Sequence, residues 1–337
     1  MISRLYVGSM EKTFTIAHLS DLHLSPFFYP ERSLHFRSIL SYCEQRNVDH
    51  IIITGDITHL AKENEFRHFR KILKEFSLLD SQKMTVINGN HDIFGGPYYA
   101  EDVLNFPSAC RAVDYGQKMD QFFQYTKETF LSVRHLLKDN YFPFLKIIGD
   151  IAIVGINSVP EWHAVKNPLG SNGKVNRDQF ENLKKLLKSG ELDQKTIVIA
   201  IHHHFAEFNE NSQMSSLERM WTAIESVTLK LRKKKRLIKL FSRANVAAVL
   251  HGHVHCHGTY IKHGLTFANA GATIVPAKHS HQAFHLFSVR AGGVTIENMM
   301  ISHGIRAHQK INVVGSLRKR LAHGDISITS SVETPNN

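Results

Sequence analysis

Five short groups of polar residues along this chain carry side chains that commonly bind metal ions. Each group follows an apolar run, and together they supply two carboxylates, four imidazoles and one amide oxygen. Nitrogen and oxygen donors without a thiolate favour Mn, Fe, Zn or Co over Ca or Mg alone. The candidate ligands are Asp21, His23, Asp56, Asn90, His202, His253 and His255.

The apolar runs before these groups are predicted to be β-strands. In the central one, Ile51–Asp56, three isoleucines and a threonine run directly into Gly55 and Asp56. Such a continuous run predicts a strand buried on both faces. The other predicted strands are Phe14–Leu19, Met84–Ile87, Lys195–Ile201 and Val246–Leu250. In open α/β sheets ligands bind beyond the carboxyl ends of the strands, so we expect the seven side chains to meet there.

Helical periodicity separates the first three strands. Apolar residues recur at helical spacing in Glu31–Asn47 and Lys62–Leu79, which predicts a parallel strand–helix–strand–helix–strand unit. A third helix is predicted at Asn176–Lys188, with Asn176 as its N-cap. Leu145–Ile148 and Ile151–Asn157 are predicted to pair antiparallel and to begin a second sheet.

Seven ligands are too many for one transition-metal ion that must keep a position open for substrate. They suit two divalent ions about 3.5–4 Å apart with one bridging carboxylate. Asp56 is the expected bridge, because it follows the central strand and a carboxylate offers two oxygens. A site of this kind generates a bridging hydroxide near neutral pH and acts in displacement at phosphorus. Mn is the expected ion, and Fe, Zn or Co are alternatives.

The turn Gly89-Asn90-His91-Asp92 also predicts a catalytic pair. His91 follows a candidate ligand and is expected to face the substrate, where it can stabilise charge or protonate the leaving oxygen. Asp92 is expected to fix the tautomer of His91.

The motifs Asp21-x-His23, Gly55-Asp56, Gly89-Asn90-His91-Asp92, His202 and Gly252-His253-x-His255 together resemble the calcineurin-like metallophosphoesterases. The resemblance implies a four-layer αββα sandwich of the α/β class. It also implies that one ion takes Asp21, His23, Asp56 and His255, while the other takes Asp56, Asn90, His202 and His253, with His91 catalytic. His202 is chosen over His203 and His204 because it comes first after its strand.

The family motifs span most of the chain and define one predicted domain, residues 13–302. Within it, residues 94–144 interrupt the strand–helix rhythm and are interpreted as a helical insertion or cap beside the site. A helix that packs on the main core is the alternative. Residues 303–337 are polar and are predicted to form a partly disordered tail.

The chain is basic, with a formal net charge of +11, which favours phosphate-bearing or anionic partners. The segment Leu231–Leu240 is rich in Lys and Arg, and it is either a solvated helix face or a patch for phosphate or an anionic membrane surface. We identify no signal peptide and no membrane-spanning segment. Three cysteines without a CxxC pair fit a reducing compartment. The expected location is cytoplasmic, or peripheral on the inner face of the membrane.

The motifs predict a metal-dependent phosphoric ester or anhydride hydrolase, but they leave its substrate open. UDP-2,3-diacylglucosamine, a nucleotide-linked lipid of lipid A biosynthesis, is the first hypothesis. The widespread enzyme for that step carries Arg where this chain has His91, so a match would be to the chlamydial-type branch. A 3',5'-cyclic-nucleotide phosphodiesterase is the alternative. An inactive scaffold is disfavoured because every ligand position is filled, and no nucleic-acid motif is present.

Overall fold

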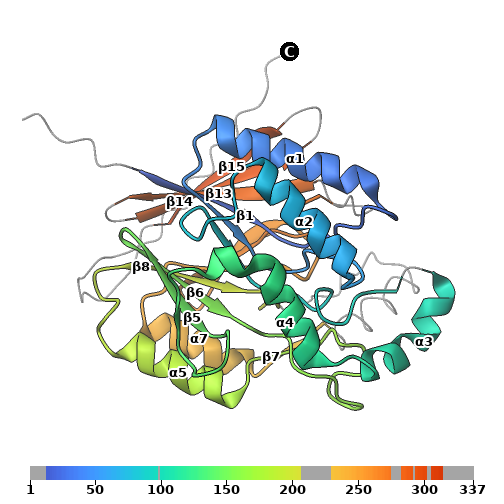
Figure 1. Cartoon of the computed structure of the whole chain (residues 1–337). Helices are drawn as coiled ribbons and strands as arrows, with labels where there is room; N and C mark the ends of the chain where they lie inside the picture. Colours follow the sequence, from blue (N-terminus) through green and yellow to red (C-terminus); the bar gives the residue numbers. More distant parts are fainter. Residues whose placement is uncertain are drawn as a thin grey trace, which may run out of the picture.

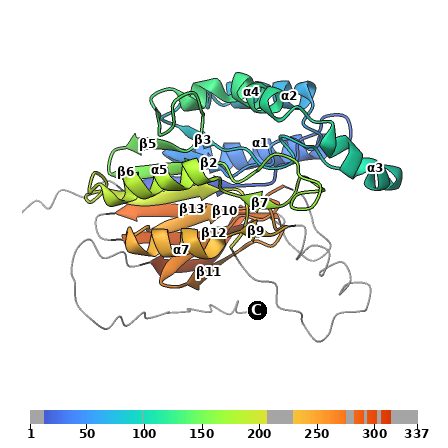
Figure 2. The ribbon, with the colours of Figure 1, turned by 90° about the horizontal axis from the view of Figure 1, so that it is seen from below.

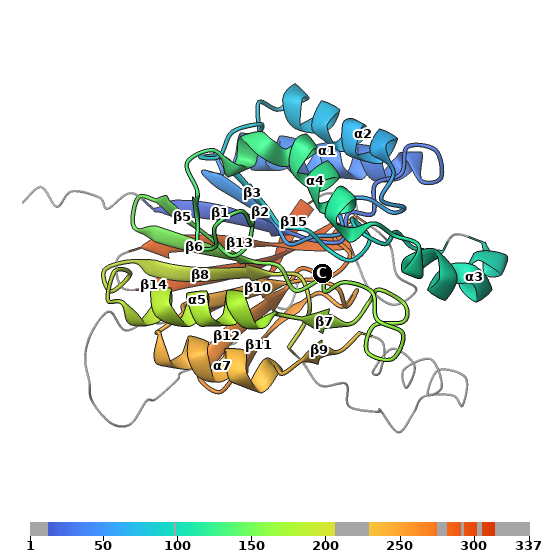
Figure 3. The same ribbon diagram turned by 60° about the horizontal axis from the view of Figure 1, so that its bottom comes forward.

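Two β-sheets lie face to face, and helices cover both outer surfaces (Figure 1, Figure 2). The computed structural model describes residues 13–97, 99–205, 229–274, 282–290, 293–301 and 305–313. Helices α1, α2 and α4 lie on one side of the paired sheets, and α5 and α7 lie on the other (Figure 3). This confirms the predicted four-layer αββα sandwich.

The first sheet contains the strands that open the chain and those that close it. Its order is β15-β14-β13-β1-β2-β3, with β1, β2 and β3 parallel and β13 antiparallel to β1. The crossovers are α1 (Pro30–Gln45) and α2 (Glu63–Glu75), as predicted. The strands are β1 (Phe14–Leu19), β2 (His50–Ile53), β3 (Met84–Val86), β13 (Gln282–Arg290), β14 (Gly293–Ile301) and β15 (Ile305–Val313).

Strand β15 corrects the predicted extent of the polar tail. It lies within residues 303–337 but pairs antiparallel with β14 at the edge of the first sheet. An edge strand can form on backbone hydrogen bonds offered by its neighbour and tolerates a polar sequence, so composition alone did not reveal it. Residues 314–337, including the end predicted to be disordered, lie outside the described residues.

The second sheet has the order β11-β12-β10-β8-β6-β5-β4. Its centre is parallel, from β6 through β8 and β10 to β12, and β5 joins β6 antiparallel as predicted. Helices α5 (Arg177–Lys188) and α7 (Lys234–Arg243) cover its outer face, and Asn176 caps α5 by accepting from the backbone N–H of Gln179. The strands are β4 (Arg134–His135), β5 (Phe144–Ile148), β6 (Ile151–Ile156), β8 (Thr196–Ile201), β10 (Ala248–His251), β11 (Gly258–Lys262) and β12 (Leu265–Asn269).

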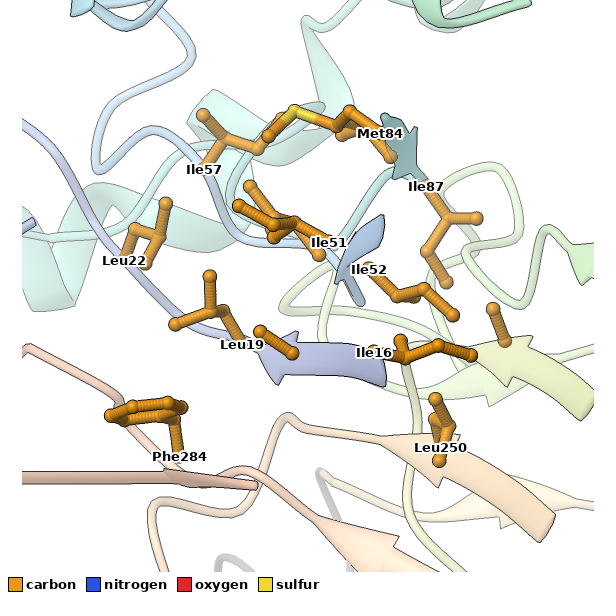
Figure 4. Close-up of a cluster of buried hydrophobic side chains, with 14 of the residues drawn as sticks. Ile16, Leu19, Leu22, Ile51, Ile52, Ile57, Met84, Ile87, Leu250 and Phe284 are labelled. Atoms are coloured by element: carbon orange, nitrogen blue, oxygen red, sulfur yellow. The ribbon is translucent and has the colours of Figure 1, made fainter. Parts of the chain in front are cut away.

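Alternate residues of the second sheet face two separate cores. In β8, Val198 and Ala200 join the core shared with the first sheet, whereas Ile199 joins the core beneath α5 and α7. Leu250 of β10 likewise packs in the shared core with residues such as Ile16 (Figure 4). The continuous apolar runs in the sequence therefore reflect strands covered on both faces.

The structure divides residues 94–144 into two parts. Helix α4 (Tyr115–Thr126) packs on α2, where the ring centroids of Phe66 and Phe122 lie 6.4 Å apart. A 3-10 turn, η1 (Lys127–Phe130), continues from α4. Helix α3 (Ala100–Arg111) instead protrudes from the body, and its Leu104 is 85% exposed (Figure 3). The second half of the segment is thus core packing, and a substrate cap involving α3 stays a prediction.

The basic segment Leu231–Leu240 also has two parts. Leu231–Arg232 form strand β9, which pairs parallel with β7 (Gly173–Lys174) in a separate two-stranded sheet. Helix α7 begins only at Lys234. Residues 206–228, which precede this segment, lie outside the described residues.

Candidate metal centre

Seven predicted ligands meet at the carboxyl edge shared by the two sheets. β1 leads to Asp21 and His23, β2 to Asp56 and β3 to Asn90. From the second sheet, β8 leads to His202, and β10 leads to His253 and His255. All are buried except His255, which is exposed.

The first cluster of donor atoms comprises Asp21, His23, His255 and Asp56. The Nε2 atoms of His23 and His255 are 3.1 Å apart, and Nε2 of His255 lies 3.7 Å from Asp21 Oδ1. Nε2 of His23 is 3.8 Å from Asp56 Oδ2. Ligand atoms of Asp21, His23 and His255 all lie within 4.8 Å of one another, and Asp56 Oδ2 reaches this group beside His23.

The second cluster comprises Asp56, Asn90, His202 and His253. Nε2 of His202 lies 3.1 Å from Asn90 Oδ1 and 3.4 Å from Asp56 Oδ2. Nδ1 of His253 is 3.1 Å from the same His202 nitrogen. One carboxylate oxygen, Asp56 Oδ2, thus belongs to both clusters.

The hydrogen bonds of His202 show that these atoms fit a cation. Its Nδ1–H donates to the carbonyl of Thr54 at 2.8 Å, so Nε2 of the neutral ring carries a lone pair. That lone pair faces two oxygen acceptors, Asp56 Oδ2 and Asn90 Oδ1. Acceptors that face one another need a positive charge between them, supplied by a metal ion or by a proton.

The electrostatics of the buried site agree with this requirement. Burial opposes a charged ring at His202, yet the Asp56 carboxylate raises the pKa of His202 to about 9. Burial, followed by the neighbouring His91, holds the pKa of His23 well below its ordinary value. Burial and then His203 do the same to the pKa of His253. Neutral imidazole is the form that binds metal.

The backbone around the site is strained. Asp21, His23, Asp56 and His253 all have positive φ, between 44° and 73°, a region that non-glycine residues seldom occupy. Such strain collects at functional sites where the surrounding fold enforces it. The backbone of Gly252 also lies close to the Asp21 carboxylate, because a Cβ at Gly252 would be 2.1 Å from Asp21 Oδ2. Only glycine fits there without a shift of its neighbours.

His91 lies beside the first cluster. Its ring centroid is 4.4 Å from that of His23, and its backbone N–H donates to Asp56 Oδ1 at 2.7 Å. Nδ1–H of His91 donates to the backbone carbonyl of His59 at 3.0 Å. The prediction that Asp92 fixes the His91 tautomer is therefore wrong, because the carbonyl of His59 occupies that position.

Asp92 instead holds the turn that carries Asn90 and His91. Its buried carboxylate accepts from the backbone N–H of Gly89 and of Thr58, each at 2.9 Å, and from the Thr58 hydroxyl at 3.0 Å. Burial, followed by the charge of Asp56, raises the pKa of Asp92 to about 7. Asp92 therefore links the turn after β3 to the loop after β2.

His203 faces away from the donor atoms. It pairs through Nδ1 with the hydroxyl of Ser158 at 2.8 Å and donates from Nε2 to the carbonyl of Ser171. The geometry thus favours His202 over His203 as the ligand. A ring nitrogen of His59 lies within 4.8 Å of ring nitrogens of His23 and His91. The His59 ring also stacks on that of His91, with the centroids 5.6 Å apart. The hydrogen bond from His91 goes to the His59 backbone carbonyl, for which the sequence gives no signal.

Known proteins share both the motifs and the architecture of this chain. The family model described as calcineurin-like phosphoesterase matches residues 14–257, which include every predicted ligand. The chain belongs to the calcineurin-like phosphoesterase family. This confirms the predicted family, and the donor set fits the divalent metals expected for it.

One curated relative of this calcineurin-like phosphoesterase is distant in sequence. Transmembrane protein 62 from Mus musculus is 25% identical over 224 residues, which are 62% of this chain and 30% of that protein. The match thus spans less than a third of the length of the curated relative. No helix that the structure describes is long and apolar enough to cross a membrane.

Solved structures share the fold at low identity. A dimetal phosphatase from Danio rerio has a TM-score of 0.60 and 10% identity, and the match covers 90% of this chain and 99% of that one. The purple acid phosphatase PPD1 from yellow lupin (Lupinus luteus) has a TM-score of 0.58 and 11% identity, covering 90% and 54%.

Proposed function

We propose that this calcineurin-like phosphoesterase hydrolyses a phosphodiester or phosphoanhydride bond with two divalent metal ions. The observation that carries the proposal is the sharing of Asp56 Oδ2 by two clusters of donor atoms. Asp21, His23, Asp56 and His255 would hold one ion, and Asp56, Asn90, His202 and His253 the other. Their nitrogen and oxygen donors suit Mn, with Fe, Zn or Co as alternatives.

When bound, the ions would supply Lewis acidity to the phosphoryl oxygens. The chain's own contribution is to hold the donor atoms in place before substrate arrives. The Thr54 carbonyl keeps the His202 lone pair aimed at Asp56, and the His91 N–H holds Asp56 by its other oxygen. This preorganisation limits the rearrangement that the reaction would otherwise require.

His91 is the proposed general acid. Because its Nδ1–H donates to the carbonyl of His59, the proton available for transfer is on Nε2. A ring in that orientation can donate to the leaving oxygen as the bond to phosphorus breaks. Asp92 acts as a positioning residue, through its hydrogen bonds to Gly89 and Thr58.

UDP-2,3-diacylglucosamine is the proposed substrate. Water would add to one phosphorus, the anhydride P–O bond would break, and UMP and a phosphorylated lipid would leave. The loop after His23 supports an apolar substrate, because Phe27 is 80% exposed and contacts Phe28, whose ring in turn contacts Tyr99 at the start of α3. The net charge of +11 supports a phosphate-bearing ligand and an anionic membrane surface at the cytoplasmic face.

The proposal is tested by incubating Mn²⁺-loaded protein with UDP-2,3-diacylglucosamine, cyclic AMP and bis(p-nitrophenyl) phosphate in parallel. Release of UMP with cyclic AMP untouched supports the lipid-linked substrate. Hydrolysis of cyclic AMP alone would replace it with the cyclic-nucleotide activity. Absence of hydrolysis in all three reactions, with two ions bound, would contradict the proposed function.

A further inference from the structure

A pocket rich in basic residues lies outside the metal centre, between the first turns of α5 and α7. It is a pocket of about 380 Å³, and five of its ten lining residues are cations. We call it the basic pocket, lined by Lys174, Val175, Asn176, Arg177, Phe180, Glu181, Arg232, Lys233, Arg236 and Leu237. We propose that the basic pocket binds a phosphate-bearing anion.

The cations of the basic pocket are poorly compensated. Glu181 is the only acidic residue on its wall, and its carboxylate is shared between Arg236, at 4.0 Å, and Lys184, at 3.5 Å. Within the described part of the chain, the other four cations of the pocket form no ion pair with a carboxylate. Their mutual repulsion is relieved when a multiply charged anion enters.

The two helices add to the positive potential. Arg177 is the first residue of α5, Lys233 precedes α7, and both residues line the pocket, so both helix N-termini lie at its wall. Partial positive charge at a helix N-terminus favours acidic residues or bound anions there. Helix α7 has no acidic residue in its first turn, which begins Lys234-Lys235-Arg236. Such a sequence fits a helix whose first turn faces an external anion.

One guanidinium in the pocket is already oriented. Arg236 stacks on the ring of Phe180, with its Cζ 4.3 Å from the ring centroid. Stacking holds the planar group in place, so less conformational entropy is lost when it donates to a phosphate. Arginine can make two parallel hydrogen bonds to one phosphate.

Strand β7 contacts the basic pocket on one side and residues next to the metal centre on the other. Strand β7 supplies Lys174 to the pocket, and a Cβ on its Gly173 would lie 2.4 Å from the ring of His203. The His203 ring is 4.3 Å from that of His253 in the second cluster. The small β7–β9 sheet therefore lies between the basic pocket and the second cluster.

The test compares two variants that lose the same charge. The pocket variant is Arg177→Gln/Arg232→Gln. The control is Lys235→Gln/Lys239→Gln, which removes two exposed cations of α7 that do not line the pocket. Binding of inorganic pyrophosphate to the metal-loaded proteins is measured by calorimetry, and any binding at the metal centre contributes equally to both. Hydrolysis of bis(p-nitrophenyl) phosphate shows whether that centre is intact.

We expect the pocket variant to lose one pyrophosphate site or to bind it at least about tenfold more weakly, because a charge-assisted hydrogen bond is worth roughly that factor. The affinity of the control variant for pyrophosphate should change by less than about twofold. Equal changes in both variants, or no change in either, would overturn the proposal.

A second experiment decides whether the pocket binds the phosphate of a lipid headgroup or a soluble phosphate. Co-sedimentation with phosphatidylcholine vesicles, with and without phosphatidic acid, is measured for the same proteins. Selective loss of phosphatidic acid binding by the pocket variant assigns the pocket to a lipid headgroup, whereas unchanged vesicle binding assigns it to a soluble phosphate. The binding measurements of both experiments do not depend on catalysis, so failure of the proposed hydrolase function would be seen separately.

Discussion

The two carboxylate oxygens of Asp56 have different partners. Oδ1 accepts the backbone N–H of His91 at 2.7 Å, whereas Oδ2 lies 3.8 Å from His23 Nε2 and 3.4 Å from His202 Nε2. One oxygen fixes the side chain, which leaves the other for both clusters. This division explains how a single residue can belong to both clusters of donor atoms.

Replacing Asp56 with Asn should therefore remove metal. An asparagine can still accept from His91 through its oxygen, but its NH₂ group would stand where Oδ2 is, without a lone pair to donate. We expect at least one ion to be lost and turnover to fall by at least about 10²-fold, since even outer ligand contacts are worth 10–100-fold. Metal content by mass spectrometry and phosphodiester hydrolysis measure the two effects. Asp150→Asn, at a side chain that is 91% exposed, is the control, and retention of two ions by Asp56→Asn would refute the shared-ligand assignment.

His91→Ala should separate catalysis from metal binding. The side chain of His91 contacts His23 and donates to the His59 carbonyl, but the bond to Asp56 comes from the backbone and survives the substitution. We expect two bound ions and a loss in kcat of roughly 10²–10⁴-fold, the usual range for a positioned acid. His135→Ala, at an exposed position in β4, serves as the control. Wild-type turnover in His91→Ala would exclude the proposed role.

Replacing His202 and replacing His203, the adjacent histidines after β8, should have different effects on metal content. His202→Ala removes a nitrogen that faces Asp56 and Asn90, so we expect the second cluster to lose its ion. His203→Asn removes a ring that is bonded to Ser158 and Ser171, so the metal content should stay at two. Metal analysis of both folded variants distinguishes them, and the opposite pattern would make His203 the ligand.

Asp92→Asn should loosen the turn that carries His91. One carboxylate oxygen accepts from Gly89 and the other from Thr58, so an amide NH₂ would face a donor at one of these positions. We expect a loss of about 1–3 kcal/mol in unfolding free energy, the cost of an unsatisfied buried group. Urea denaturation measures it, and kcat should fall less than in His91→Ala. An unchanged urea midpoint would show that these bonds do not stabilise the turn.

The buried side chain of Lys146 should make the free energy of unfolding depend on pH. Lys146 of β5 is 1% exposed and donates from Nζ to the carbonyls of Met84 and Thr129, both at 2.7 Å. Burial lowers the pKa of Lys146 to about 7 from its ordinary 10.5. Between these values the unfolded chain binds more protons than the folded protein, so stability should rise with pH by up to about 1.4 kcal/mol per unit.

The contribution of Lys146 is isolated by comparison with Lys146→Met. Urea denaturation at pH 7, 8 and 9 should show wild type gaining stability relative to the variant as pH increases. Lys185→Met, at an exposed position of α5, should show no such trend. A constant difference between wild type and Lys146→Met would mean that Lys146 keeps its ordinary pKa in the folded protein.

Local sequence patterns were sufficient for much of the fold. Strand β2 and the ligand after it were predicted because a β-branched run followed by Gly-Asp is a feature of adjacent residues. The N-cap of α5 at Asn176 was predicted for the same reason. Strand β15 was missed because its evidence is a partner strand, β14, and not its own composition.

The sequence by itself determined the family, the layered fold and the seven residues whose donor atoms form the two clusters, since these depend on residue type and on order after each strand. Only the tertiary structure decided that Asp56 Oδ2 is common to both clusters and that the His59 carbonyl orients His91. It alone also assembled the basic pocket from Arg177 and Arg232, which are distant in the chain. Backbone acceptors are the same at every residue, and contacts between distant segments depend on how the strands pair, so neither leaves a local pattern to read.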